Sequence, residues 1–238
     1  MESTHTKWHS NALGHELDML EFGKTGIPLL LFPTSMGTYT QNRDSGLIDS
    51  AAWFISEGLV HIYCIDTFDS NTWYNKSVAP VQRIQNYQRY ETMLATELLP
   101  RLLSENNQKR MAVAGCSFGA WHAVNIAFRH PSMISYLFSM SGMFDIRPQL
   151  DGYYDDTAYF NNPVDYVPGL NDPDLWRMGI ALGTGEFDIC LDANRRFSDL
   201  LNAKHVDHWL DIQPGASHDW PLWRQIFPHY LSLMNFSG

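Results

Sequence analysis

Short apolar runs alternate with helix-like stretches along this chain, and that alternation constrains its fold more than any other feature. The apolar runs span residues 27–33, 60–68, 110–117, 134–142, 177–185 and 205–215. Helical patterns fall at residues 50–57, 83–104, 118–129, 192–203 and 220–234. Strands that are apolar along their whole length and are separated by helices pack into a mainly parallel sheet covered on both faces. We therefore predict an α/β fold, with a hairpin around Leu13 to Glu21 adding antiparallel strands.

The chain of 238 residues is long enough for one large domain, and it contains no repeat or low-complexity linker that would divide it. We expect a single domain over residues 1–238. Residues 144–175 interrupt the alternation with a stretch rich in Tyr, Asp, Asn, Pro and Gly. Such a stretch either caps an active site with aromatic walls or is a solvated connection. Its acidic residues lack the spacing of a calcium loop, so no metal site is predicted.

Composition narrows the partners that the chain can have. The formal net charge of −10 disfavours nucleic acids and anionic membrane surfaces, and it favours a small neutral substrate. The three cysteines, Cys64, Cys116 and Cys190, show no metal-ligand spacing. With neither a signal-peptide pattern nor an apolar run of about 18 residues, we expect a cytoplasmic protein with reduced thiols. No feature specifies an oligomeric state.

Ser117 is the candidate nucleophile. It stands in Gly115-Cys116-Ser117-Phe118-Gly119, between a predicted strand and a predicted helix. A serine in a sharp strand-to-helix turn needs small neighbours, because side chains at the flanking positions would clash with the strand and the helix. The motif alone is weak, and the strand and helix around it strengthen the prediction.

A nucleophilic serine needs a base, an acid and donors for the oxyanion. When nucleophile, acid and base follow one another in this order along the chain, the base lies after the last strand, where His218 stands in SHDWPLW. Glu186 and Asp188 are both plausible acids at the end of the preceding strand. The oxyanion donors are expected to be the amide of Phe118 and the amide of Ser35 or Met36.

Five segments carry a resemblance to a known family: FPTSMG, IDTFDSNTWYN, GCSFGAWHA, GTGEFDICLDANRRF and SHDWPLWR. On these motifs the chain resembles the putative-esterase branch of the α/β hydrolases, which includes esterase D, feruloyl esterases and the antigen 85 mycolyltransferases. The resemblance implies the α/β-hydrolase fold, places the base at His218 and favours Asp188 over Glu186 as the acid. Pro33-Thr34-Ser35 departs from the His-Gly or Asp-Gly of many relatives.

These features predict a serine carboxylic-ester hydrolase that acts through an acyl-enzyme on small or medium acyl esters and needs no cofactor. Trp73, Tyr74 and Trp220 are candidate pocket residues, with core packing as their alternative. Two rival functions stay open. The same three residues could transfer the acyl group to an alcohol or thiol, or the fold could serve a non-catalytic binding protein.

Overall fold

One eight-stranded sheet organises the chain, and the computed structural model describes residues 2–236. The strands lie in the order β1-β2-β4-β3-β5-β6-β7-β8. β4, β3, β5, β6, β7 and β8 run parallel to their neighbours, whereas β1 and β2 pair antiparallel with each other and β2 pairs antiparallel with β4. The predicted mainly parallel α/β fold is confirmed, and so is its N-terminal antiparallel hairpin.

The strands are β1 Thr4–Ser10, β2 His15–Phe22, β3 Ile27–Phe32, β4 Val60–Ile65, β5 Met111–Cys116, β6 Ile134–Met140, β7 Gly179–Phe187 and β8 Trp209–Ser217. The α-helices are α1 Gln41–Asp44, α2 Leu47–Ser50, α3 Ala52–Ser56, α4 Pro80–Met93, α5 Leu99–Glu105, α6 Phe118–Arg129, α7 Asp156–Tyr159, α8 Pro163–Tyr166, α9 Leu191–Ala203 and α10 Trp220–Leu231. The helix predicted over residues 83–104 is interrupted by a π-helical turn, Leu94–Leu98. Pro100 follows this turn and lacks the N–H that a regular helix would use there.

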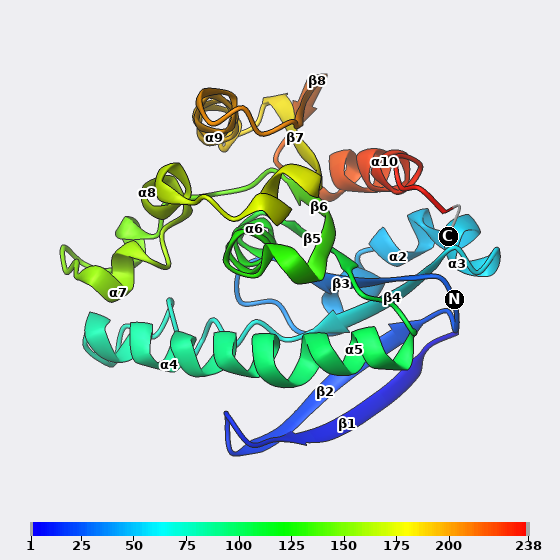
Figure 1. Ribbon diagram of the computed structural model, residues 1–238, viewed down its shortest axis with the longest axis horizontal. Helices are drawn as coiled ribbons and strands as arrows, with labels where there is room; N and C mark the ends of the chain where they lie inside the picture. The colour runs from blue at the N-terminus through cyan, green and yellow to red at the C-terminus, as the bar shows by residue number, and fades with distance from the viewer. Residues whose placement is uncertain (1, 237–238) are drawn as a thin grey trace.

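The sheet buries both of its faces, because successive side chains of each central strand point to opposite sides. In β3, Leu30 joins the core beneath α4, α5, α6 and α9, whereas Leu29 and Leu31 join the core beneath α2, α3 and α10. Figure 1 shows α4, α5 and α6 on one side of the sheet and α2, α3 and α10 on the other. This two-sided burial explains why the strands are apolar along their whole length.

Residues 144–175 form short helices joined by turns instead of one open loop. Tyr166 on α8 donates a hydrogen bond from its buried hydroxyl to Oδ1 of Asn125 on α6, at 2.9 Å. Arg83 on α4 donates to the carbonyl of Gln149 at 2.7 Å and to the carboxylate of Asp151 at 2.6 Å. Figure 1 shows α8 beside α6, with α7 farther from the sheet. The segment is therefore anchored on the side of the sheet that carries α4 and α6.

The arrangement of the last four strands positions the candidate site. β5, β6, β7 and β8 are neighbours in the sheet and parallel, so their carboxyl ends meet at one edge. Ligands of open α/β sheets bind at this edge. Ser117 follows β5, Asp188 follows β7 and His218 follows β8.

Candidate active site

Ser117 occupies a strained turn between β5 and α6, with φ 57° and ψ −122°. A Cβ on Gly115 would lie 2.2 Å from the carbonyl oxygen of Gly119, and one on Gly119 would lie 2.1 Å from the carbonyl oxygen of Pro33. Both glycines are thus required by close backbone contacts. Cys116 packs on the opposite side of the sheet from α6, and burial raises the pKa of its thiol well above the usual value. It is therefore a core residue.

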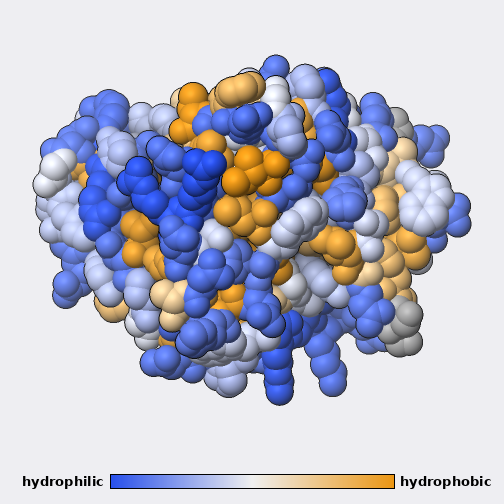
Figure 2. Space-filling view, turned by 90° about the horizontal axis from the view of Figure 1, so that it is seen from above, coloured by the Kyte–Doolittle hydropathy of each residue, from blue (hydrophilic) through white to orange (hydrophobic). Residues whose placement is uncertain are grey.

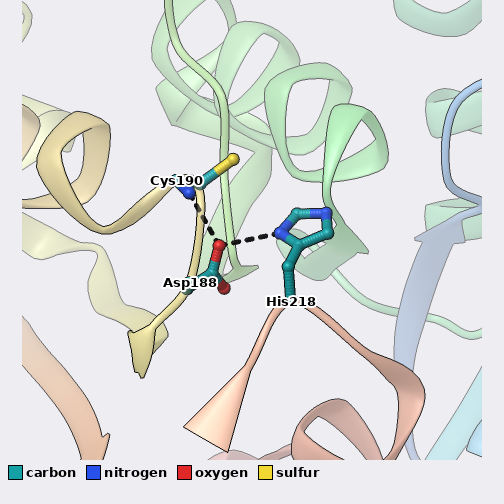
Figure 3. Close-up of side chains that lie close together, drawn as sticks. All are labelled: Asp188, Cys190 and His218. Atoms are coloured by element: carbon teal, nitrogen blue, oxygen red, sulfur yellow. Dashed lines mark hydrogen bonds and ion pairs between the residues drawn. The ribbon is translucent and has the colours of Figure 1, made fainter.

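Hydrogen bonds join Ser117, His218 and Asp188 in one line. His218 Nε2 lies 2.9 Å from Ser117 Oγ, and His218 Nδ1 lies 2.8 Å from Asp188 Oδ1. The Asp188 side chain is fully buried and that of His218 is 19% exposed. Figure 3 shows Asp188 reaching the imidazole from the connection between β7 and α9. The structure thus brings together the predicted nucleophile, base and preferred acid.

The two charged partners shift each other's pKa in opposite directions. Burial lowers the pKa of His218, but hydrogen bonds and charge from Asp188 and Cys190 outweigh it and raise the pKa to about 9. Burial raises the pKa of Asp188, but hydrogen bonds from His218, Ser141 and the Cys190 amide outweigh it and lower the pKa to about 2. Asp188 is thus held ionised, and it stabilises the protonated imidazole.

Ser141 and Trp223 form a support behind Asp188. Ser141 Oγ donates to Asp188 Oδ2, and Trp223 Nε1 donates to Ser141 Oγ at 2.8 Å. Ser141 follows β6 with φ 55°. Trp223 is buried, as expected of a core residue, but its indole also orients this serine. Sequence reasoning missed Ser141. The signal available for it was its place near the carboxyl end of the strand predicted over residues 134–142, at the edge that carries the site.

Glu186 lies apart from this line. β7 continues through Phe187, so Glu186 is exposed on the strand, where Oε2 accepts a hydrogen bond from the Gly215 amide at 2.8 Å. Between Glu186 and Asp188, the structure places only Asp188 against His218. Only Phe187 lies between them in the chain, but β7 ends at Phe187, so Glu186 belongs to the strand and Asp188 to the turn that follows it.

The expected oxyanion donors lie at the start of α6 and in the loop after β3. Phe118 is the first residue of α6, so its amide has no intrahelical acceptor. The loop after β3 directs the Met36 amide to Asp69 Oδ2, at 3.0 Å. The amides of Thr34 and Gly37 are also bonded, to Gln41 and to Thr34. Within residues 34–37, the Ser35 amide is the one that bonds to no other group in the described part of the chain.

The three candidate pocket residues have different surroundings. Trp73 is fully buried against Tyr87 and Trp121, so its prediction as a pocket residue is wrong and its packing alternative holds. Tyr74 is half-buried, packs edge-on against Phe118 and donates from its hydroxyl to Ser35 Oγ at 3.1 Å. Trp220, half-buried at the start of α10, packs edge-on against Trp223. Tyr74 and Trp220 therefore keep exposed surface, and Trp73 does not.

Exposed apolar side chains flank the acid. Phe187 and Ile189, on either side of Asp188, are 67% and 85% exposed. Figure 2 shows apolar side chains gathered among hydrophilic ones on the face that it presents. A groove of about 550 Å³ begins at Ile189 and runs between α9 and the segment after β6, where Phe144 and Leu200 line it. The lining of this groove includes Ile189, the neighbour of Asp188 in the chain, but none of Ser117, Asp188 and His218.

Within residues 2–236, one group of side chains offers three possible metal ligands within 4.8 Å of one another: Asp188, Cys190 and His218. Figure 3 shows that Asp188 already accepts hydrogen bonds from the Cys190 amide, at 2.7 Å, and from His218. The group could supply a thiol, an imidazole and a carboxylate. In the structure described here, the carboxylate and the imidazole are engaged with each other and with Ser117.

The parallel sheet, the strained serine between β5 and α6 and the histidine after β8 together define an α/β hydrolase. The sequence model of the family described as putative esterase matches residues 32–233, and the chain belongs to this family. The protein is thus a carboxylic ester hydrolase, as the resemblance predicted. No curated sequence matches the chain.

Solved structures share the fold over nearly the whole chain. A ferulic acid esterase has a TM-score of 0.75 at 19% identity, covering 98% of this chain and 96% of that one. An S-formylglutathione hydrolase from Agrobacterium tumefaciens has a TM-score of 0.75 at 16% identity, covering 97% and 93%. The fluorophosphonate-binding serine hydrolase FphF from Staphylococcus aureus has a TM-score of 0.73 at 14% identity, covering 98% and 97%. At these identities, the likeness establishes the shared fold.

A helix that crosses a bilayer must be long and apolar, and this can be checked against the helices of residues 2–236. None of them is both long and apolar enough to cross a bilayer.

Proposed function

We propose that the protein is a serine esterase that hydrolyses small or medium acyl esters through an acyl-enzyme on Ser117. One observation carries the proposal: His218 contacts Ser117 Oγ through Nε2 and Asp188 through Nδ1. This is the geometry in which an imidazole can take the serine proton while a carboxylate stabilises the resulting charge.

The reaction has two halves. Ser117 Oγ attacks the ester carbonyl carbon as its proton passes to His218 Nε2, and the carbonyl oxygen becomes an oxyanion bound by the amides of Phe118 and Ser35. When the intermediate collapses, the bond to the alcohol oxygen breaks and His218 returns the proton to that oxygen. Water, deprotonated by His218, then attacks the acyl-enzyme, releasing the acid and restoring the Ser117 hydroxyl.

Ser117→Ala tests this function, with p-nitrophenyl acetate as the substrate and fluorophosphonate labelling as an independent readout. We expect the variant to lose labelling and about 10³-fold or more of kcat, because it keeps the oxyanion donors but lacks the nucleophile. Full turnover by the variant would refute the proposal. An unlabelled, inactive wild-type protein would favour a non-catalytic binding role instead.

Acyl transfer and hydrolysis are distinguished by their products. Adding an alcohol or thiol acceptor and measuring acid against the new ester shows whether water or the acceptor takes the acyl group.

We further propose that the enzyme works in a reducing, cytoplasmic compartment, which its three free cysteines support. A small ester, with no nucleic acid or membrane, is its proposed partner, and no cofactor takes part.

A further inference from the structure

A buried hydrogen bond links helix α6 to Asp69, in the connection after β4. His122 Nε2 lies 2.9 Å from Asp69 Oδ1, and both side chains are fully inaccessible to solvent. The other carboxylate oxygen, Asp69 Oδ2, accepts the amide hydrogen of Met36 at 3.0 Å. Each oxygen of this buried carboxylate thus has one donor, which offsets part of the cost of removing it from water.

The surroundings of His122 fix which nitrogen carries the proton. A carboxylate oxygen only accepts, so Nε2 is the donor to Asp69. Nδ1 of His122 is buried and has no partner among residues 2–236. The rings of Phe32, Tyr87, Tyr90, Phe118 and Trp121 surround the imidazole. Because no other polar group competes for the ring, its orientation is set by Asp69.

The backbone conformation of Met36 requires a contact that fixes its amide. Met36 has φ 59°, a left-handed conformation that is uncommon for a residue with a side chain, and such a backbone persists where its surroundings fix it. The bond from its amide to Asp69 fixes the peptide plane that joins Ser35 to Met36. The amide of Ser35 is one residue earlier, so any rotation of this turn moves it.

The same helix begins with the other expected donor. Phe118 starts α6, and His122 lies one turn further along it. A chain of contacts therefore runs from Phe118 through α6 to His122, on to Asp69 and then to Met36, next to Ser35. It ties the two oxyanion donors to each other through groups that do not contact the substrate.

We propose that Asp69 and His122 are positioning residues that set the separation of the two oxyanion amides. This inference rests on the proposed function, because it assigns the pair to the same oxyanion site. Gln41 and Tyr74 hold the loop independently, through Thr34 and Ser35. Loss of the pair therefore displaces the loop without unfolding it.

His122→Met and His122→Gln form the matched test, because both side chains are unbranched and only Gln restores a donor toward Asp69. For His122→Met, we expect kcat on p-nitrophenyl acetate to fall about 10- to 100-fold, a sizeable part of the loss seen when one oxyanion donor is removed. KM stays within about threefold, because substrate binding does not use the oxyanion. His122→Gln recovers most of kcat.

The Ki of a trifluoromethyl ketone is a readout that would stay unchanged if the pair had a purely structural role. It forms an oxyanion when Ser117 attacks it, so its Ki is expected to rise in His122→Met by about the same factor as kcat falls. Tyr230→Phe is the control. It removes a buried donor to Asp211, at 2.8 Å, on the other face of the sheet, and is expected to lower Tm while leaving kcat and this Ki unchanged.

Should His122→Met not fold, Asp69→Ala replaces it, since it removes the acceptors of both the His122 bond and the Met36 bond. The same fall in kcat and rise in Ki are expected. If the wild-type chain hydrolyses the ester and the folded variant keeps kcat and Ki within twofold of wild type, the positioning role is refuted alone. If the wild-type chain neither hydrolyses the ester nor labels at Ser117, the proposed function is refuted as well.

Discussion

Replacing Asp188 by Asn removes the charge behind His218 while preserving the shape of the side chain. Asp188 Oδ1 accepts from His218 Nδ1 and from the Cys190 amide, and Oδ2 accepts from the Ser141 hydroxyl. An asparagine whose oxygen stays at the Oδ1 position keeps the first two bonds and turns its amide group toward Ser141. The hydroxyl of Ser141 can rotate and accept, so this arrangement loses the charge and keeps the imidazole tautomer.

The pKa of His218 gives the size of the effect. Its rise from an ordinary 6.5 to about 9, against the opposing effect of burial, corresponds to roughly 3 kcal/mol of extra stabilisation of the protonated ring, with Asp188 as the largest contributor and Cys190 as the second. The same stabilisation is needed when the ring receives the Ser117 proton, so, at a pH above the acid limb of both enzymes, where the resting ring is neutral, we expect Asp188→Asn to lower kcat on the order of 100-fold. A larger loss, toward 10⁴-fold, means that the new amide has turned to Nδ1 and reversed the tautomer.

The assay is steady-state hydrolysis of p-nitrophenyl acetate, with Glu186→Gln as the matched control. Glu186 contacts the Gly215 amide, which a glutamine oxygen can also accept, so we expect its kcat to stay within about twofold. If Asp188→Asn kept wild-type kcat while Glu186→Gln lost it, the acid would be Glu186 and the geometric reasoning would be wrong. Wild-type kcat in both variants would mean that neither carboxylate assists His218.

The same pair of variants makes a prediction about pH. The base must be neutral to accept the proton, so kcat/KM falls as the pH drops through the pKa of His218. Because Asp188 raises that pKa, the acid limb of the wild-type profile lies above pH 6.5. In Asp188→Asn it moves to lower pH, since burial remains and the charge is lost. An acid limb that stays in place would show that Asp188 does not set the pKa.

Two further substitutions follow from the contacts around the site. Ser141→Ala removes the hydroxyl donor to Asp188 and leaves the Trp223 indole without its acceptor, so we expect kcat to fall about 3- to 10-fold and Tm to drop. An unchanged kcat would limit Ser141 to a structural role. Gly119→Ala puts a Cβ 2.1 Å from the Pro33 carbonyl oxygen and pushes α6 from the oxyanion loop, and kcat is expected to fall about tenfold or more. Wild-type kinetics would show that this contact relaxes freely.

The elements that the sequence predicted well are those with a strong local signal. The six apolar runs became the six parallel strands, and all of these but the edge strand β8 are buried on both faces; the N-terminal hairpin was found near Leu13. Boundaries were less accurate. The strand predicted from His205 starts at Trp209, because His205 has φ 57° and the chain turns there. The strand predicted to end at Gly185 continues to Phe187, where pairing with β8 extends it.

The sequence predicted those site residues that a residue type and its position along the chain are enough to identify. Ser117 and His218 have few competitors at their places in the chain, and the structure joins them by a hydrogen bond. Contacts between distant segments could not be predicted in the same way. Asp69, Ser141 and His122 act through partners that are far away in sequence, and a lone histidine on an apolar helix is more often a core residue. Only the packed structure shows that His122 faces a carboxylate.

The arrangement of the site residues follows from the topology of the sheet. β5, β6, β7 and β8 succeed one another both in the chain and in the sheet, and neighbouring strands lie about 4.8 Å apart. Each strand delivers one polar residue at its carboxyl end: Ser117, Ser141, Asp188 and His218 in turn. Ser141 lies between the strands of nucleophile and acid, so it is placed to hold the acid. His218 directly follows β8, which is the edge strand, and its side chain extends from this edge toward Ser117, with which it forms a hydrogen bond. The acid therefore contacts Nδ1 of the imidazole while Ser117 contacts Nε2, so it can both orient the ring and stabilise its charge.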